Sequence, residues 1–465
     1  MLPNRALLSA VIALLLVPVP AMARFEDQPP LTLSEAQLAT LAGLGGRDAK
    51  QIRLLQTGKD PASRHAWLVE PLAVYAENAV IHAGAPASGT RLQPVRTRYF
   101  TVTDDSNYRW SLGVSPETGE VVHAVLVGPD GIRGSRQVPQ ADGSLRLEAL
   151  PADLRGPDGE TLMRDCGGGL DDPAGAAGSN PIEHIKSLWK RSATADGKLG
   201  GGLATAEIAV DTDNELLADK FSGNTSTANT YIANLFAAMN TLYESELGLH
   251  LEIKSIDLRT SPDPFTTSGS PAGSAELNEF GNWWAANRAA VDRDFVMLLS
   301  GKSSSDTSAS GIAWVLNSGS YCTATAGNGG HYSVNQVFKF TFNGGALGTV
   351  AYDLGIVAHE LGHNLGAVHT HCSNGPQIQV DNCYNIESSG FGTTCYAGPA
   401  SCPATNGGVG TLMSYCHLGI SDCGDNVEIF SPNRKTFLLG RVSSNTPVCL
   451  DVGGGANDIF ANGFE

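Results

Sequence analysis

Residues 359–369 of the chain read HELGHNLGAVH and fit the pattern HExxHxxGxxH. His359 and His363 are four residues apart, so on a helix both imidazoles project from one face. Gly366 can adopt a positive φ and end that helix, which turns the chain back and lets His369 reach the same point. Three converging imidazoles are a typical ligand set for one Zn²⁺, bound at about 2.0–2.1 Å. The stretch therefore predicts a metal site at the end of a helix.

The same residues indicate that the site is catalytic. Glu360 directly follows the first ligand, where a carboxylate can reach a metal-bound water without ligating the metal. Three protein ligands leave a fourth position for water, which a structural zinc site lacks. His371 is a rival third ligand, but it departs from the motif spacing. We expect one Zn²⁺ held by His359, His363 and His369, with Glu360 as general base; calcium sites cannot be read from the sequence.

Around this stretch the pattern alternates between helices and strands. Apolar residues at helical spacing predict helices at 227–247, 275–290 and 349–365. Alternating or continuous apolar runs predict strands at 206–210, 249–253, 295–299 and 311–316. Helices that alternate with strands are typical of an α/β sandwich. The fold class expected for this part of the chain is therefore α/β.

The N-terminal part of the chain has a different composition. Residues 1–23 read as a signal peptide, with Arg5 before an apolar run and the small-x-small pattern at 21–23. A membrane anchor is the alternative, but the run is far below spanning length. Residues 24–191 contain a helical pattern at 33–41 and β-type runs near 99–103, 108–114 and 121–127, and turn glycine-rich from about 167. We expect a smaller β-rich propeptide, a linker, a catalytic domain at 192–450 and a tail at 451–465.

Overall composition restricts the partners of the chain. The 465 residues carry 47 Asp and Glu against 30 Lys and Arg, a net charge of −17. Nucleic acids and anionic membranes need clustered basic residues, so neither is expected as the main partner. No segment after the N-terminus approaches the length of a membrane span, so no stable membrane anchor is expected either.

The zinc motif resembles that of the metzincin zinc endopeptidases. That family also has a methionine turn beneath the metal, and Gly410-Thr411-Leu412-Met413-Ser414-Tyr415 is similar to it. The chain is most similar to the reprolysin (adamalysin)-like metzincins. The resemblance implies a catalytic domain with a mixed twisted sheet and an active-site helix. It also implies that 311–316 is an edge strand with which substrate pairs.

Two residues depart from the reprolysin pattern. Thr370 follows the third histidine, where adamalysins usually carry Asp. Tyr415 stands two residues after Met413, which is similar to astacins and serralysins, where that tyrosine can ligate zinc or steady the transition state. Plain packing is the alternative for Tyr415.

The cysteine pattern points to an exported, latent protein. Eight of the nine cysteines lie in the second part of the chain, and an even number in an exported domain suggests four disulfides. They are Cys322, Cys372, Cys383, Cys395, Cys402, Cys416, Cys423 and Cys449. Cys166 is the odd one, just before the glycine-rich segment. We expect it to act as a cysteine switch that fills the fourth zinc position, similar in kind to the latency cysteine of matrix metalloproteases and adamalysins; a free or intermolecular thiol is the alternative.

These observations predict a secreted zinc metalloendopeptidase made as a latent precursor. Its partners are expected to be protein or peptide substrates, and the mature form is expected to be monomeric. Two other classes stay open: a zinc amide hydrolase acting on cell-wall peptides, and a non-catalytic zinc-containing adhesion or binding protein. The C-terminal tail resembles short endings on some exported Gram-negative bacterial proteins.

Overall fold

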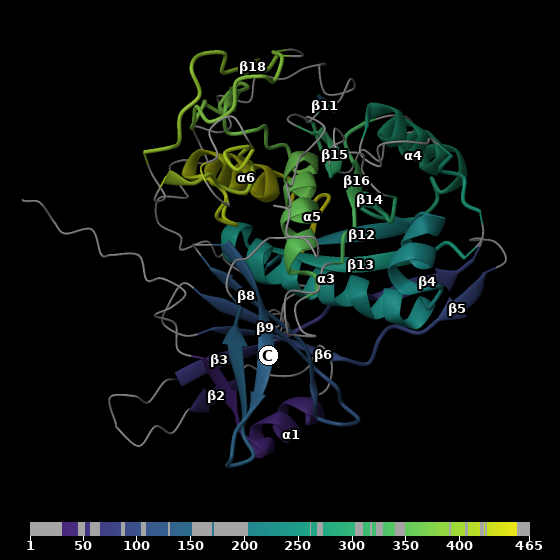
Figure 1. Cartoon of the computed structure of the whole chain (residues 1–465). Helices are drawn as coiled ribbons and strands as arrows, with labels where there is room; N and C mark the ends of the chain where they lie inside the picture. Colours follow the sequence, from purple (N-terminus) through teal and green to yellow (C-terminus); the bar gives the residue numbers. More distant parts are fainter. Residues whose placement is uncertain are drawn as a thin grey trace, which may run out of the picture.

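The computed structural model describes a large part of the chain, in two large β-sheets and one short two-stranded sheet, with helices (Figure 1). The described residues are 30–44, 52–55, 66–84, 89–103, 108–128, 131–150, 170–171, 203–260, 262–266, 273–302, 310–316, 319–321, 329–339, 349–389, 392–404, 408–418, 423 and 426–452. The expected signal peptide, Cys166, Cys322 and the tail from 453 onward lie outside them.

The first sheet is built from the N-terminal segment. It has eight strands in the order β1-β10-β9-β8-β7-β6-β3-β2, and every neighbouring pair is antiparallel. The strands are β1 (Leu31–Leu33), β2 (Ile52–Leu55), β3 (Ala66–Leu72), β6 (Arg98–Thr103), β7 (Arg109–Val114), β8 (Val121–Gly128), β9 (Gly131–Pro139) and β10 (Leu145–Ala149). Helix α1 (Glu35–Gly43) begins at Ser34, whose side chain forms a capping box with Gln37.

Side-chain alternation gives this sheet a hydrophobic face of its own. Tyr108, Trp110, Leu112 and Val114 are all buried in one cluster with Trp67 of β3. Successive residues of a strand point to opposite faces, so alternate positions along the strand share this core. The β-rich pattern predicted for 108–114 is thus a strand with one face buried on the N-terminal core.

The second sheet carries the helices. Its order is β11-β15-β16-β14-β12-β13-β4-β5, with β19 also paired to β12. From 203 onward its strands are β12 (Ala204–Thr212), β13 (Leu249–Leu258), β14 (Phe295–Ser300), β15 (Gly311–Val315), β16 (Tyr332–Gln336) and β19 (Asp451–Val452). β13, β12, β14 and β16 are parallel in turn, whereas β15 is antiparallel to β16. This is a mixed α/β arrangement, as expected.

Among the described residues, five helices accompany this sheet. They are the short η3 (Leu216–Lys220), α3 (Thr225–Leu247), α4 (Ser274–Asn287), α5 (Ala351–Asn364) and α6 (Pro432–Asn445). The predicted spans 227–247, 275–290 and 349–365 coincide with α3, α4 and α5 within a few residues. Among the described helices, none combines the length and the apolar character needed to cross a membrane.

The N-terminal segment also contributes strands to the second sheet. β4 (Tyr75–Ala83) pairs in parallel with β13, and β5 (Thr90–Leu92) pairs with β4. Helix α3 contacts β13 and, on its other side, β6, β7 and β8 of the first sheet (Figure 1). Residues of the expected propeptide are therefore part of the central sheet, and the two segments are joined along α3.

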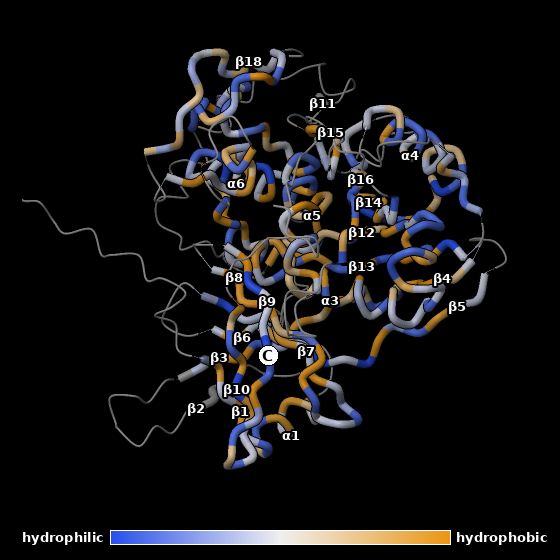
Figure 2. The backbone as a smooth tube through the Cα atoms, viewed as in Figure 1, coloured by the Kyte–Doolittle hydropathy of each residue, from blue (hydrophilic) through white to orange (hydrophobic). Residues whose placement is uncertain are grey.

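Apolar and polar contacts both hold this junction together. Ile81, Tyr99 and Val125 lie in the same buried cluster as the inward side chains of α3, and Figure 2 shows hydrophobic segments of α3 beside those of β8. The hydroxyl of Tyr99 donates to Asn234 Oδ1 at 2.7 Å, and that of Tyr75 donates to Asn229 Oδ1 at 3.0 Å. The hydrophobic core of the second sheet is thus completed by N-terminal side chains.

One further strand comes from the expected linker. β11 (Leu170–Asp171) pairs in parallel with β15, with Leu170 opposite Trp314 and Asp171 opposite Val315. The strand for which an edge position is expected therefore has a neighbour on each side in the intact chain.

Replacing Ile81 by alanine tests whether the junction is one cooperative unit. Ile81 has no exposed surface, so the change leaves a cavity and should lower the free energy of unfolding by about 2–5 kcal/mol. Hydrogen exchange should accelerate at α3 and β13 as well as at β4. Val122→Ala, at a position 36% exposed on β8, should change little. Faster exchange confined to β4 and β5 would contradict a shared core.

Candidate metal centre

Three imidazoles converge at the end of α5. His359 Nε2 lies 3.3 Å from His369 Nε2, and His363 Nε2 lies 3.1 Å from the same atom. All three rings are buried. Two ligands of a tetrahedral zinc ion at about 2.0–2.1 Å lie about 3.3–3.4 Å apart, so the observed spacing fits such an ion.

Local backbone geometry explains why these rings meet. α5 places His359 and His363 one turn apart on the same face. Gly366 follows with φ of +112°, a conformation that side chains rarely adopt, and it turns the chain away from the helix axis. His369 then returns to face both helical rings. The positive φ that the sequence predicts for Gly366 is confirmed.

The outer nitrogen of each ring is held by an acceptor. His359 Nδ1 donates to the carbonyl of Leu412 at 2.6 Å, and His363 Nδ1 donates to the carbonyl of Ala367 at 2.6 Å. His369 Nδ1 lies 2.7 Å from Glu387 Oε2. A carbonyl or carboxylate oxygen can only accept, so the proton resides on Nδ1 and the Nε2 lone pairs point inward.

Burial keeps the two helical imidazoles neutral. Desolvation, aided by the neighbouring imidazoles, lowers the pKa of His359 well below its usual range and the pKa of His363 to about 3. Neutral imidazoles with inward lone pairs are the form that ligates a metal. The spacing of the three rings and the neutral state of the two helical ones fit the predicted Zn²⁺.

Glu360 lies between the two helical ligands and faces β15. Its side chain is buried, and it packs so closely on Gly311 that a Cβ there would come within 2.3 Å of Glu360 Oε1. Glycine at the start of β15 therefore leaves space for the carboxylate. Glu360 is thus positioned between the ligand helix and the strand expected to bind substrate.

The predicted methionine turn lies directly under α5. Met413 is fully buried, and a Cβ on Gly362 would come within 2.6 Å of its sulfur. The backbone of this turn makes two hydrogen bonds to the site. The carbonyl of Leu412 accepts from His359 Nδ1, and the carbonyl of Met413 accepts from the backbone N–H of Thr370 at 2.9 Å. The turn therefore supports one helical ligand and the loop that carries the third.

Tyr415 packs against the ligand rings. Its ring is stacked on His359 at an interplanar angle of 11° with centroids 6.1 Å apart, and it lies 4.1 Å from the His369 centroid. The structure thus brings Tyr415 to the site. Its role in zinc ligation or transition-state stabilisation stays a prediction.

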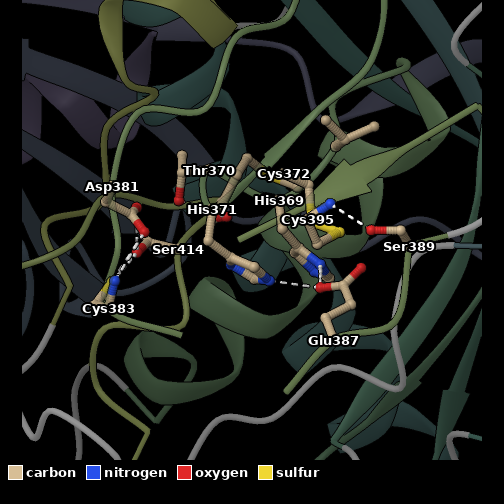
Figure 3. A network of polar contacts seen from close by, with 12 residues as sticks. His369, Thr370, His371, Cys372, Asp381, Cys383, Glu387, Ser389, Cys395 and Ser414 are labelled. Carbon is tan, nitrogen blue, oxygen red and sulfur yellow. Dashed lines mark hydrogen bonds and ion pairs between the residues drawn. A yellow bond between two sulfur atoms is a disulfide. The ribbon is translucent and has the colours of Figure 1, made fainter. Parts of the chain in front are cut away.

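His371 is turned away from the inward-facing lone pairs. Its Nε2 lies 2.7 Å from Glu387 Oε2, and its ring stacks on His369 with centroids 5.3 Å apart (Figure 3). The three closely spaced ligand nitrogens belong to His359, His363 and His369. His369, rather than His371, thus stays the predicted third ligand.

Glu387 is a site residue that sequence reasoning missed. It accepts from both His369 and His371 (Figure 3). Burial opposes its ionisation, but His369 and His371 together hold the pKa of this carboxyl well below its usual range. It lies 18 residues after His369 in a loop with no regular periodicity, so no local pattern indicates its role.

Disulfides fix the segment that surrounds the site. The three described bonds are Cys372–Cys395, Cys383–Cys416 and Cys402–Cys423, and Cys449 is also disulfide-bonded. Cys372 and Cys395 also face each other in the short sheet of β17 (Cys372–Ser373) and β18 (Thr394–Cys395). Cys383–Cys416 ties the loop to the methionine turn. Disulfides of this kind fit an exported protein.

Arg434 of α6 is a second residue that the sequence did not reveal. Its buried guanidinium donates to the carbonyls of Val368, His369, Cys372 and Ile378 at 2.7–2.9 Å. Burial lowers its pKa to about 10, so it stays charged at neutral pH. The side chain anchors the return loop of the third ligand to α6.

Replacing Arg434 by methionine should release this loop. The change keeps the apolar stem but leaves buried carbonyls without a donor, so the free energy of unfolding should fall by about 2–5 kcal/mol. Bound metal, measured by elemental analysis, should fall as well. Lys435, the next residue, has a side chain that is 36% exposed and pairs with Glu246. Lys435→Met should therefore have a small effect and serves as the control. Wild-type stability and metal content in Arg434→Met would contradict the anchoring role.

One family model matches the part of the chain that carries the three histidines. Residues 203–429 match the family model "Reprolysin_5: Metallo-peptidase family M12". Solved structures that are similar include metalloproteinase-II from Bacteroides fragilis, at 13% identity and a TM-score of 0.33, covering 72% of this chain and 86% of that one. A chaperone-substrate complex matches at 14% identity and a TM-score of 0.29, covering 52% and 35%. TM-scores this low carry no weight for fold or function. No curated protein sequence matches the chain.

Proposed function

Residues 203–429 form a reprolysin-like metzincin metallopeptidase domain, and from this premise we propose that the chain is a secreted zinc-dependent endopeptidase made as a latent precursor. One observation carries the proposal: three buried imidazoles meet at the spacing of tetrahedral zinc ligands, next to the buried carboxylate of Glu360. This arrangement suits hydrolysis of a peptide bond in a protein or peptide substrate.

The residues of the site divide the chemistry among them. His359, His363 and His369 would hold Zn²⁺, which when bound polarises a carbonyl and makes water more acidic. Glu360 accepts a proton from the attacking water and returns it to the leaving nitrogen. β15, beside Glu360, offers its backbone to an extended substrate.

Latency is supported by the pairing of β11 with β15. In the intact chain, residues 170–171 occupy the side of β15 where substrate is expected to pair. Cys166 stands four residues before β11 in the sequence. We propose that this segment, with Cys166 as the fourth zinc ligand, blocks the site until it is cleaved away. The signal sequence at 1–23 supports secretion of this precursor.

Replacing Glu360 by alanine tests the general base. The three ligands and their Nδ1 acceptors are untouched, so zinc content should stay at one per chain. Turnover of a fluorogenic peptide by the processed enzyme should fall by about 10²–10⁴-fold. Asp219→Ala, an exposed carboxylate change, serves as the matched control, and a zinc chelator should abolish wild-type activity. Peptidase activity retained in Glu360→Ala would reject the assignment.

Replacing Cys166 by serine tests the latency device. A serine hydroxyl is a far poorer zinc ligand than a thiolate, so the uncleaved variant should cleave peptide while the uncleaved wild type stays silent. Activity should be measured with intact mass confirmed, since cleavage during the assay would imitate the effect. A variant precursor that remains as silent as wild type would rule out the thiol and leave strand pairing as the block.

A further inference from the structure

We propose that Glu387 is a positioning residue that holds His369 in its ligating orientation and thereby sets the affinity of the site for zinc. This inference rests on the proposed zinc site and adds to it a residue outside the HExxHxxGxxH motif. It is carried by the contacts of the carboxylate, the place of His369 in the fold and the closure of the loop that bears Glu387.

The contacts show one oxygen serving two imidazoles. Glu387 Oε2 lies 2.7 Å from His369 Nδ1 and 2.7 Å from His371 Nε2, and Figure 3 shows the carboxylate at the tips of both rings. The rings of His369 and His371 are stacked at 12°. Each nitrogen donates to the same acceptor, so the stacked pair and the carboxylate fix one another.

His369 needs such support more than the other ligands do. His359 and His363 are fixed by α5 and donate to backbone carbonyls. His369 lies in a loop after the helix, and its outer nitrogen meets a side-chain carboxylate. A carboxylate acceptor orients a ligand histidine and raises its basicity more than a neutral carbonyl does. Of the three ligands, His369 is therefore the one whose orientation and ligand strength depend on another side chain.

The loop that carries Glu387 is closed next to the site. Cys372, the residue after His371, is bonded to Cys395, and the N–H of Cys395 donates to Ser389 Oγ at 2.9 Å. On the same loop, Asn385 Nδ2 donates to the carbonyl of Gly398 at 2.7 Å. The disulfide and the Ser389 hydrogen bond close the loop beside Glu387 without involving the ligand rings, whereas the Asn385 side chain contacts Gly398 and not the imidazoles.

A second metal site explains the position of the Glu387 carboxylate less well than support of His369 does. His371, Cys372, Glu387 and Cys395 are close enough to suggest a second ligand group. Both sulfurs are in a disulfide, however, and a thiolate is needed for such a ligand set. The remaining contacts of Glu387 are the two imidazoles, which is the arrangement of a carboxylate supporting a ligand histidine.

The test compares zinc affinity in the full chain for wild type, Glu387→Gln, Glu387→Ala and Asn385→Ala. Zinc binding is measured by competition with a chromogenic chelator, and thermal unfolding of the zinc-free proteins is measured in parallel. We expect about 10–100-fold weaker binding in Glu387→Ala, a smaller loss in Glu387→Gln, which keeps an acceptor, and binding within about twofold of wild type in Asn385→Ala. Zinc-free unfolding should be nearly unchanged in Glu387→Gln.

Each result decides a separate point. Wild-type zinc affinity in both Glu387 variants would overturn the positioning role. Equal losses in Asn385→Ala and Glu387→Ala, or a matching loss of zinc-free stability in Glu387→Gln, would also overturn it, because they would indicate a role in loop folding alone. A wild-type chain that binds no zinc would instead refute the proposed function. Loss of the His369 Nδ1 proton signal in ¹⁵N NMR of zinc-free Glu387→Ala would support the orienting contact directly.

Discussion

The site depends on one constraint: the Nε2 atom of the third imidazole must lie about 3.3–3.4 Å from those of the two imidazoles on α5, the distance between two ligands of one tetrahedral zinc ion. A helix alone cannot supply it, because a helix carries its later residues away along its axis. Gly366 makes the reversal with a positive φ. Arg434 then fixes the returning backbone through four carbonyls, and the methionine turn supports it from below. Gly366, α6 and the methionine turn thus together position the imidazole of His369.

Short-range patterns predicted the parts of the molecule that depend on short-range physics. The helices α3, α4 and α5 and the strands β12 to β15 follow from apolar periodicity. The ligand set follows from spacing, since His359 and His363 share a helix face and Gly366 can reverse the chain.

Long-range contacts could not be read in the same way. Arg434 is 65 residues from His369, and nothing in its neighbourhood distinguishes it from a surface arginine on an amphipathic helix. Glu387 lies in an irregular loop, and the contacts that close this loop beside the rings, the Cys372–Cys395 disulfide and the Ser389 hydrogen bond, show no local sequence pattern. The pairing of β4 with the second sheet could not be predicted from the sequence for a related reason. The pattern of a strand shows which of its faces is buried, but not which strand it pairs with.

The placement of β4 has a consequence if the proposed propeptide is cleaved from the catalytic domain. β13 is an interior strand only because β4 covers its outer side with a parallel partner. If the segment before 192 is cut and departs, the backbone N–H and C=O groups along that side are left open, and the apolar surface of α3 beneath Tyr99 and Val125 is uncovered with them. An open strand edge next to apolar surface is a template for self-association. If the proposed propeptide is removed, the remaining catalytic domain would therefore be prone to self-association unless the cleaved piece stays bound.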